Sequence, residues 1–461
     1  MKIFFLIFIV FSGCMVGPKY DQPDVAMPEE FVEKKNDETA LADLKNWWKS
    51  FDDPQLDHFV DIAIENNYNL QIALEKIEET RAFYRIKKAD LFPEIDMTAS
   101  AVRYGVSQNL VQTSLIPQST YNVFQVGFDA IWELDLFGKV RREKRAAFYE
   151  MQSMQENMRD VYVTIISDVA RYYIDICAIQ SIMDLLKEKI DYQTMILELM
   201  KDRNIHGIDS QIAPEQEIAI LQEETEKLIF YSTSLKQTIY RLAVLLGMQP
   251  EKITISFLKC TKIPQAENKV KIGMPSSLLR NRPDIRKAER QLASTTEKIG
   301  AAIAEYFPSF SLTGDSNLKT SKLQDLFSSK SFAWSFGSLM NWPIITFGRI
   351  RANVDVKKSQ EKQALLFYEN TILDALKDVE GSLIAYFNEQ EKLKNVQEEL
   401  QAVAEITYLE ESKYLNGISN YIDYLEQEKN LLEKKIKKVE SERTLSHNLI
   451  ALYKALGGGE W

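Results

Sequence analysis

The sequence predicts a mainly α-helical protein that also carries membrane β-strands, with two internal structural repeats in one chain. Three observations predict this fold class. The chain resembles itself at a nearly constant offset, it contains runs in which apolar and polar residues alternate, and it contains very long helical patterns with few glycines or prolines. Alternation with period two is typical of strands, and apolar spacing near 3.6 residues is typical of helices.

The composition is that of a folded protein, and it excludes several functional classes. Hydrophobic residues make up 45% of the 461 positions and charged residues 27%, which is not a disordered composition. The net charge of −11 argues against a general nucleic-acid binder. Only three cysteines are present, and His58, His206 and His447 lack the spacing of metal ligands. We therefore predict no catalytic residues, no metal site, no cofactor and no nucleic-acid partner.

Residues 1–13 are predicted to be a signal peptide. A basic start is followed by nine apolar residues, 3–11, which are too few for a membrane helix and fit a secretory signal. The following Ser-Gly-Cys14 resembles a bacterial lipobox, which implies cleavage before Cys14, its acylation and a lipidated extension over residues 14–52. Met15 stands where lipoproteins of the inner membrane typically have Asp, and this favours the outer membrane. An ordinary signal with an incidental cysteine is the alternative.

The self-similarity extends over about 180 residues. An offset of 215 relates residues 69–98 to 284–313, and an offset of 210 relates the segments that follow. The matched positions include Phe92-Pro93 with Phe307-Pro308, Trp132 with Trp342, Phe137-Gly138 with Phe347-Gly348, Arg141 with Arg351, Gly207-Ile208 with Gly417-Ile418, and Leu246-Gly247 with Leu456-Gly457. One five-residue adjustment over this length indicates a duplication. We predict repeat 1 at 53–265 and repeat 2 at 266–461.

Each repeat is predicted to begin with a helix and to end with a long helix and a return helix. The first helix starts at the N-cap Asp53, followed by Pro54, and runs to Leu91, where Pro93 stops it. The long helices would each reach about 100 Å at 1.5 Å per residue. Two short helices end to end match one long helix, which suggests a helical barrel of alternating paired and unbroken helices. The helical pattern around Cys177 predicts a core thiol rather than half of a disulfide.

Two strand-like runs follow the first helix of each repeat, at about 93–137 and about 308–347. Over residues 124–136 every second residue is apolar, and charged residues such as Asp129 lie between them. The pattern fits either a soluble sandwich or a membrane barrel with a polar lumen. No later stretch reaches eighteen apolar residues, and the secretory signal favours the barrel. Because four strands cannot close a barrel, we expect the chain to oligomerise.

Four segments carry a resemblance to a known family. They are CMVGPKYDQP at 14–23, WWKSFDDPQL at 47–56, the stretch 274–314, and ALYKALGGGEW at 451–461. With them, the whole mature chain is similar to TolC-like outer-membrane efflux proteins, in particular the NodT-type lipoproteins of resistance-nodulation-division (RND) efflux systems. The resemblance implies a homotrimer whose twelve-stranded β-barrel continues as a twelve-helix periplasmic α-barrel. It implies a passive, non-enzymatic exit duct that works with a periplasmic adaptor protein and an inner-membrane RND pump, embedded in outer-membrane lipid.

The resemblance also implies a periplasmic gate near the last helix break. Tyr414, three residues before a glycine, matches the tyrosine that holds the family's tip closed. Ile422, Asp423 and Glu426 match an apolar ring and two acidic rings, with Glu426 in place of the more common Asp. A solvated helix face with acids three residues apart is the alternative for these residues.

Two glycine breaks, at Gly207 and Gly417, are predicted to form the turns on which the adaptor docks. A plain helix C-cap, for which glycine is the usual residue, explains them equally well, and both interpretations can hold together.

Two other functions fit the same sequence less well. The exit duct of a type I protein secretion system keeps the fold and changes the partner, but the lipobox favours efflux. A periplasmic coiled-coil scaffold without a pore fits the long helices but leaves the aromatic strands unexplained.

Overall fold

The computed structural model describes residues 15–24, 46–105, 120–252, 263–265 and 281–458. Cys14 lies outside the described residues. The chain divides into two compact units, one made of 1–24, 76–155 and 287–369, the other of 25–75, 156–286 and 370–461. Each unit draws on both halves of the sequence, so the predicted repeats remain a division of the sequence and not of the compact units.

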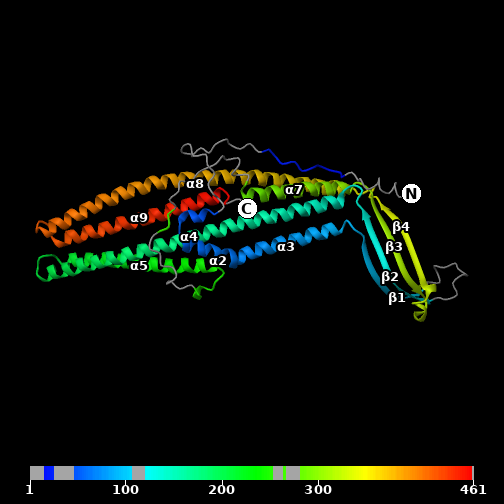
Figure 1. The fold of residues 1–461 in the computed structure, drawn as a ribbon, viewed down its shortest axis with the longest axis horizontal. Coiled ribbons are helices and arrows are strands. Elements are labelled where there is room, and N and C mark those ends of the chain that lie inside the picture. The colour runs from blue at the N-terminus through cyan, green and yellow to red at the C-terminus, as the bar shows by residue number, and fades with distance from the viewer. Residues whose placement is uncertain (1–14, 25–45, 106–119, 253–262, 266–280, 459–461) are drawn as a thin grey trace. The chain divides into compact units, whose positions relative to one another are not determined.

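The first unit contains a single antiparallel sheet in the strand order β1-β2-β3-β4 (Figure 1). Its strands are β1 (Glu94–Gly105), β2 (Thr120–Leu134), β3 (Ser309–Thr320) and β4 (Phe332–Asn341). Parts of α3 (Tyr68–Ala89) and α7 (Pro283–Ala304) also belong to this unit. Strands therefore form inside both predicted strand regions.

The register of the sheet separates a polar face from an apolar face. Asp96 is paired with Asp129, Asp129 with Asp315, and Asp315 with Ser335, so these four side chains share one face. The other face carries the apolar residues of the alternating pattern: Ile95, Met97, Phe124, Phe128, Trp132, Leu312, Trp334, Phe336 and Met340. The apolar alternation predicted over residues 124–136 is confirmed along β2 by this register.

The second unit is helical. It includes η1 (Trp47–Phe51), α2 (Pro54–Asn66), α5 (Ile212–Leu245), η2 (Pro250–Lys252) and α9 (Tyr421–Ala455). The long helices α4 (Lys139–Ile205) and α8 (Arg349–Leu415), of 67 residues each, contribute to both units. No helix among the described residues is long and apolar enough to cross a membrane.

Aromatic and polar contacts hold residues 47–56 against the helices of the second unit. The buried Trp47 stacks on Tyr453 of α9, with ring centroids 5.3 Å apart. Asp53 caps α2 as predicted, since its Oδ1 accepts from the Gln55 and Leu56 amides. The other carboxylate oxygen of Asp53 accepts from the Tyr173 hydroxyl of α4 at 2.9 Å. The cap therefore also holds α2 against α4.

The predicted unbroken helix from Asp53 to Leu91 is wrong, because Asn67 divides it into α2 and α3. Asn67 has extended backbone angles, and its Oδ1 accepts from the amides of Asn69 and Leu70. Its Nδ2 donates to the Leu245 carbonyl at the end of α5, at 2.8 Å. An asparagine that caps one helix start and one helix end is more stable outside the helix than within it.

Cys177 corrects a second expectation. It lies on α4 and is completely buried, as the helical pattern indicated, but it is disulfide-bonded and not a free thiol. The pattern of one helix shows only that a side chain is buried. It does not show which sulfur from another part of the chain reaches it.

Candidate functional site

Two matching turns reverse the chain between the long helices and the return helices of the second unit. At the first turn the Gly207 amide donates to Asn204 O and the Ile208 amide to Arg203 O, both at 2.9 Å. At the second turn Gly417 and Ile418 donate to the carbonyls three and five residues back at the same distances. Both glycines have positive φ, +71° and +72°, in open space. The turns need glycine for its backbone conformation, which supports the C-cap interpretation.

Side chains close the two turns differently. In the first turn Arg203 Nε donates to Asp209 Oδ2 at 2.5 Å, and this hydrogen bond lowers the pKa of the Asp209 carboxyl. In the second turn Glu410 accepts from the Ser419 hydroxyl and pairs with Lys413 at 2.9 Å. The hydrogen bond from Ser419 lowers the pKa of Glu410. Both turns are therefore held by a carboxylate, but by different partners.

Tyr414 belongs to a cluster of three tyrosines at the second turn. Its ring centroid lies 5.0 Å from that of Tyr421 and 6.1 Å from that of Tyr424, and the Tyr414 and Tyr424 rings are stacked. Burial raises the pKa of the Tyr424 hydroxyl, and its hydrogen bond to Glu428 at 2.9 Å raises it further. The sequence motif singled out Tyr414, and the structure adds two ring partners within the same chain.

The predicted gate residues Ile422, Asp423 and Glu426 lie in the first two turns of α9. Asp423 is exposed, and its backbone amide is capped by Asn420 Oδ1 at 3.0 Å. Ile422 is half-buried. Glu426 is exposed and pairs with the buried Lys429 at 3.2 Å, so one of the two predicted acidic positions is partly neutralised within its own chain. Sequence spacing brings these residues together, but it did not predict Lys429.

A polar cluster around the buried Lys189, which the sequence did not reveal, links three helices of the second unit. Lys189 on α4 donates to Glu224 on α5 at 3.1 Å and to Glu433 on α9 at 3.3 Å. Nearby, Gln193 of α4 donates to the Glu217 carboxylate at 2.6 Å. The partners of Lys189 are 35 and 244 residues away in the sequence, so no local pattern points to them.

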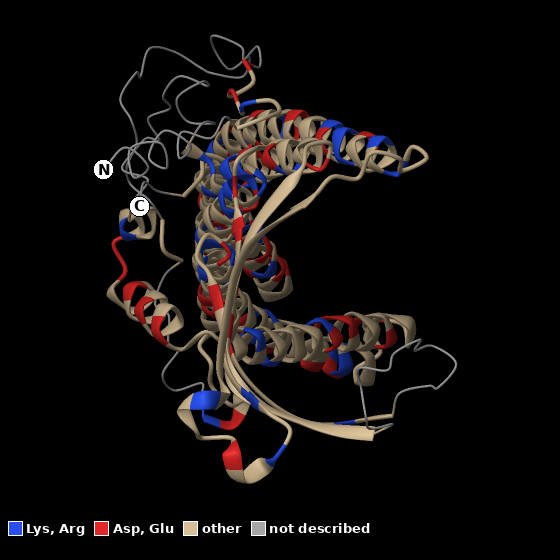
Figure 2. Cartoon of the chain, turned by 90° about the vertical axis from the view of Figure 1, so that its right-hand side faces the viewer, with Lys and Arg blue, Asp and Glu red and all other residues tan. Residues whose placement is uncertain are grey.

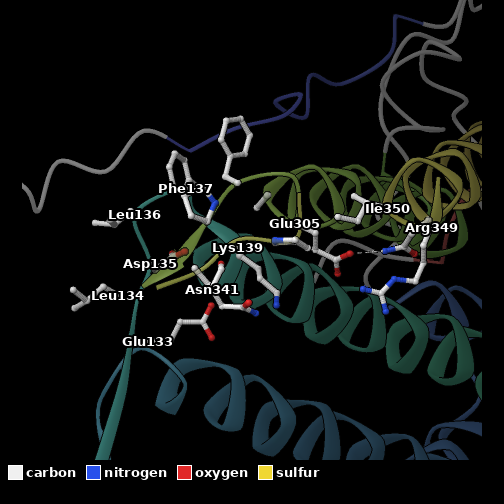
Figure 3. A pocket seen from close by; sticks show the side chains of 16 residues that line it. Glu133, Leu134, Asp135, Leu136, Phe137, Lys139, Glu305, Asn341, Arg349 and Ile350 are labelled. Carbon is white, nitrogen blue, oxygen red and sulfur yellow. Dashed lines mark hydrogen bonds between the residues drawn. The ribbon is translucent and has the colours of Figure 1, made fainter. Parts of the chain in front are cut away.

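The first unit has a cavity of about 500 Å³ where strands and helices join (Figure 3). Its charged lining residues are Glu133, Asp135, Lys139, Glu305 and Arg349. In Figure 3 the dashed line at Glu305 marks the hydrogen bond that its carboxylate accepts from the Asn353 amide, at 3.2 Å. Asp135 caps α4 by accepting from the backbone amides of Val140 and Arg141. The lining combines these charges with apolar side chains such as those of Phe137 and Phe307.

Charges of both signs are distributed along the helices (Figure 2). Within the part of the chain that the structure describes, no group of three or more His, Cys, Asp or Glu side chains could hold a metal ion. The features that stand out are two glycine turns, a tyrosine cluster and a sheet with one polar face.

Comparisons with known proteins agree over nearly the whole length. A family model described as outer membrane efflux protein matches residues 59–248 and 274–458. The solvent efflux pump outer membrane protein SrpC of Pseudomonas putida is 30% identical, over 98% of this chain and 96% of its own. Nodulation protein T of Rhizobium leguminosarum bv. trifolii is 28% identical, over 92% and 90%. The solved outer-membrane channel OprN is 27% identical with a TM-score of 0.87, covering 97% of this chain and 99% of its own.

The fold and these matches define an outer-membrane channel of the TolC-like class. The chain belongs to the outer membrane efflux protein family, and the resemblance predicted from its sequence motifs is confirmed. It is the outer-membrane channel component of a tripartite efflux pump.

Proposed function

We propose that three copies of the chain form one passive exit duct, anchored by acylated Cys14. In this assembly twelve strands close a barrel in the outer membrane, and twelve helices form the periplasmic tunnel. A periplasmic adaptor protein and an inner-membrane RND pump complete the system, and the pump supplies the energy. The duct itself only conducts.

The observation that carries the trimer is the open sheet. Strands β1 and β4 each pair on one side only among the described strands, so the sheet has two unpaired edges. Exposed edges of this length are a hazard that proteins remove by pairing or closure. Copies of the same sheet that join β4 to β1 satisfy both edges, and three copies reach a strand number at which a barrel closes.

The exposed apolar face supports insertion of this barrel into lipid. Trp334 and Phe336 on β4 are 70% and 73% exposed, and Met97 on β1 is 68% exposed. In water these side chains would be an aggregation hazard, whereas in a bilayer they face acyl chains and the aspartates face the lumen.

Trimer formation and conductance test the proposal directly. We expect protein from outer membranes to run as a heat-labile band near three times the single-chain mass, and to conduct ions in planar bilayers. Incorporation of labelled palmitate into the wild type, but not into the Cys14→Ser variant, is expected for the anchor. A monomer that reconstitutes without conductance would overturn the duct.

The second turn of the helical unit is proposed as the gate. Three-fold symmetry would bring Asp423 and Glu426 of each copy near the axis, where like charges repel one another and attract cations. We expect Asp423→Ala combined with Glu426→Ala to raise single-channel conductance and to weaken block by divalent cations. Glu251→Ala, which removes an exposed acid from η2, is the control. Unchanged conductance and block in the double variant would remove these residues from the gate.

Gly207 and Gly417 are proposed as the docking turns for the adaptor. Because Gly207 has open space around it, Gly207→Trp adds bulk outside the chain's own packing. We expect this variant to lose crosslinking to the adaptor while its trimers remain intact. Gly207→Asn, which tolerates positive φ without the bulk, should retain most of the crosslinking. Full crosslinking in the Trp variant would argue against docking at this turn.

A further inference from the structure

Residues 15–24, here called the N-terminal strap, lie against the first unit along α4 and α7. The Val16 amide donates to the Phe137 carbonyl at 3.2 Å, at the end of the sheet. Further along, the Tyr20 hydroxyl donates to Glu289 of α7 at 3.2 Å, and burial raises the pKa of that hydroxyl. The strap therefore contacts the fold at both of these points.

A buried arginine holds the beginning of the strap. Arg142, in the first turn of α4, is 1% exposed. Its Nε and Nη2 donate to the Val16 carbonyl at 3.2 and 2.9 Å, and its Nη2 also donates to the Gly17 carbonyl at 3.1 Å. Its Nη1 donates to Glu297 of α7 at 2.8 Å. One guanidinium thus joins the strap, α4 and α7.

Glycines make room for this arrangement. A Cβ at Gly300 would lie 2.6 Å from Arg142 Nε, and a Cβ at Gly17 would lie 2.6 Å from the Gly300 backbone. A Cβ at Gly138 would lie 2.6 Å from the Met15 side chain. Gly138 and Gly300 leave room for the strap and for the arginine that binds it, and Gly17 lies in the strap itself, so the strap occupies a seat without side chains at these three positions.

The charge balance explains why the seat needs both Arg142 and Glu297. A buried guanidinium without a counter-ion is costly, and Glu297 supplies the charge at 3% side-chain exposure. The remaining donors of the planar guanidinium face two backbone carbonyls, which a lysine ammonium could not engage together. The pair therefore binds the backbone carbonyls of Val16 and Gly17, and the close packing of Gly17 on Gly300 requires glycine at position 17.

We propose that the Arg142–Glu297 pair is a clamp that seats the N-terminal strap, and that this clamp fixes the lipid anchor at the end of the sheet. Met15 lies against Gly138, where β2 gives way to α4. An acyl chain on Cys14 would thus enter the bilayer beside the barrel instead of at the end of a free tether. This consequence rests on the proposed acylation, whereas the clamp does not.

Trypsin cleavage after Lys19 measures the clamp in the full chain, purified in detergent. Cleavage there releases residues 14–19, which mass spectrometry detects. Arg142→Met combined with Glu297→Gln removes both charges, so no buried ion is left unpaired and the fold is retained. We expect this double variant to release the peptide at least tenfold faster than the wild type, because the strap carbonyls lose their hydrogen-bond donors. Arg351→Met, which removes an exposed arginine from α8 in the same unit, should behave as the wild type.

Two further variants keep the test clear of a general folding defect. Gly300→Ala favours the α7 helix by its propensity, yet its Cβ displaces the guanidinium, so we expect release of the peptide to quicken. Arg142→Lys keeps the positive charge but loses the planar guanidinium with its several donors, so we expect it to release the peptide faster as well. Equal release rates in the wild type and in these variants would overturn the clamp. If the wild-type strap resists trypsin but carries no palmitate, only the proposed lipid anchor is overturned. If the protein does not conduct ions, only the proposed duct is overturned.

Discussion

The two junctions between strand and long helix have the same sequence signature but different surroundings. Phe137-Gly138 follows β2, and Phe347-Gly348 precedes α8. Phe137 stacks on Phe307 with ring centroids 4.6 Å apart, and Gly138 lies under Met15 of the strap. Phe347, by contrast, is 99% exposed, and nothing lies within 4 Å of a Cβ at Gly348.

The difference shows what the single chain lacks. Phe347 has a φ of +48°, which is unfavourable for an aromatic residue, and it receives no compensating contact within the described part of the chain. Ile344 and Ile345 beside it are 78% and 76% exposed. The first junction is covered by residues 15–24 of the same chain, and in the proposed trimer we expect a neighbouring copy to cover the second.

Removing Phe347 is the strongest way to test this comparison. Phe347→Asn suits the positive φ and deletes the exposed ring, so we expect the stability of the isolated chain to change by no more than about 0.5 kcal/mol. We expect the heat-labile trimer to be reduced at least tenfold, as measured on unheated gels of outer membranes. Phe137→Asn is the contrasting variant, since it should destabilise the chain itself by about 3 kcal/mol. An undiminished trimer in Phe347→Asn would show that the exposed junction is not at a subunit interface.

The two junctions also differ in how the start of the long helix is capped, and we expect this difference to have a smaller effect on stability. Asp135 caps α4 and pairs with Arg141 at 2.9 Å, whereas the position 210 residues later is Ile345, which cannot cap. We expect Asp135→Ala to lower the free energy of unfolding by about 1 kcal/mol, because the first amides of α4 lose their acceptor. Ile345→Ala should change it by less than half of that value, as followed by urea denaturation. Equal effects would mean that the cap contributes nothing.

These junctions also show how much the sequence could predict. The periodicity of apolar residues identified the strands and the long helices, because each of these elements depends on residues close together in the sequence. The offset between the two repeats identified the matching glycine turns. The Arg142 clamp joins residues 125 to 155 positions apart, and Asn67 bonds to a carbonyl 178 positions away. Such contacts are decided by tertiary packing, and no local pattern encodes them. The same reason explains the disulfide at Cys177.

The polar face of the sheet carries the last and smallest difference between the repeats. Asp129 is flanked across the strands by Asp96 and Asp315, while its counterpart in β4 is Leu339, which lies on the same face. Adjacent like charges cost stability in a sheet, but in a barrel lumen they favour the passage of cations. We expect Asp129→Asn to lower the cation-to-anion permeability ratio by about twofold, measured from reversal potentials under a KCl gradient. Leu339→Asn, which adds polarity without removing charge, should leave the ratio unchanged. If the two variants shift the reversal potential equally, polarity and not the row of carboxylates sets the preference, and the repeats contribute alike to the lumen.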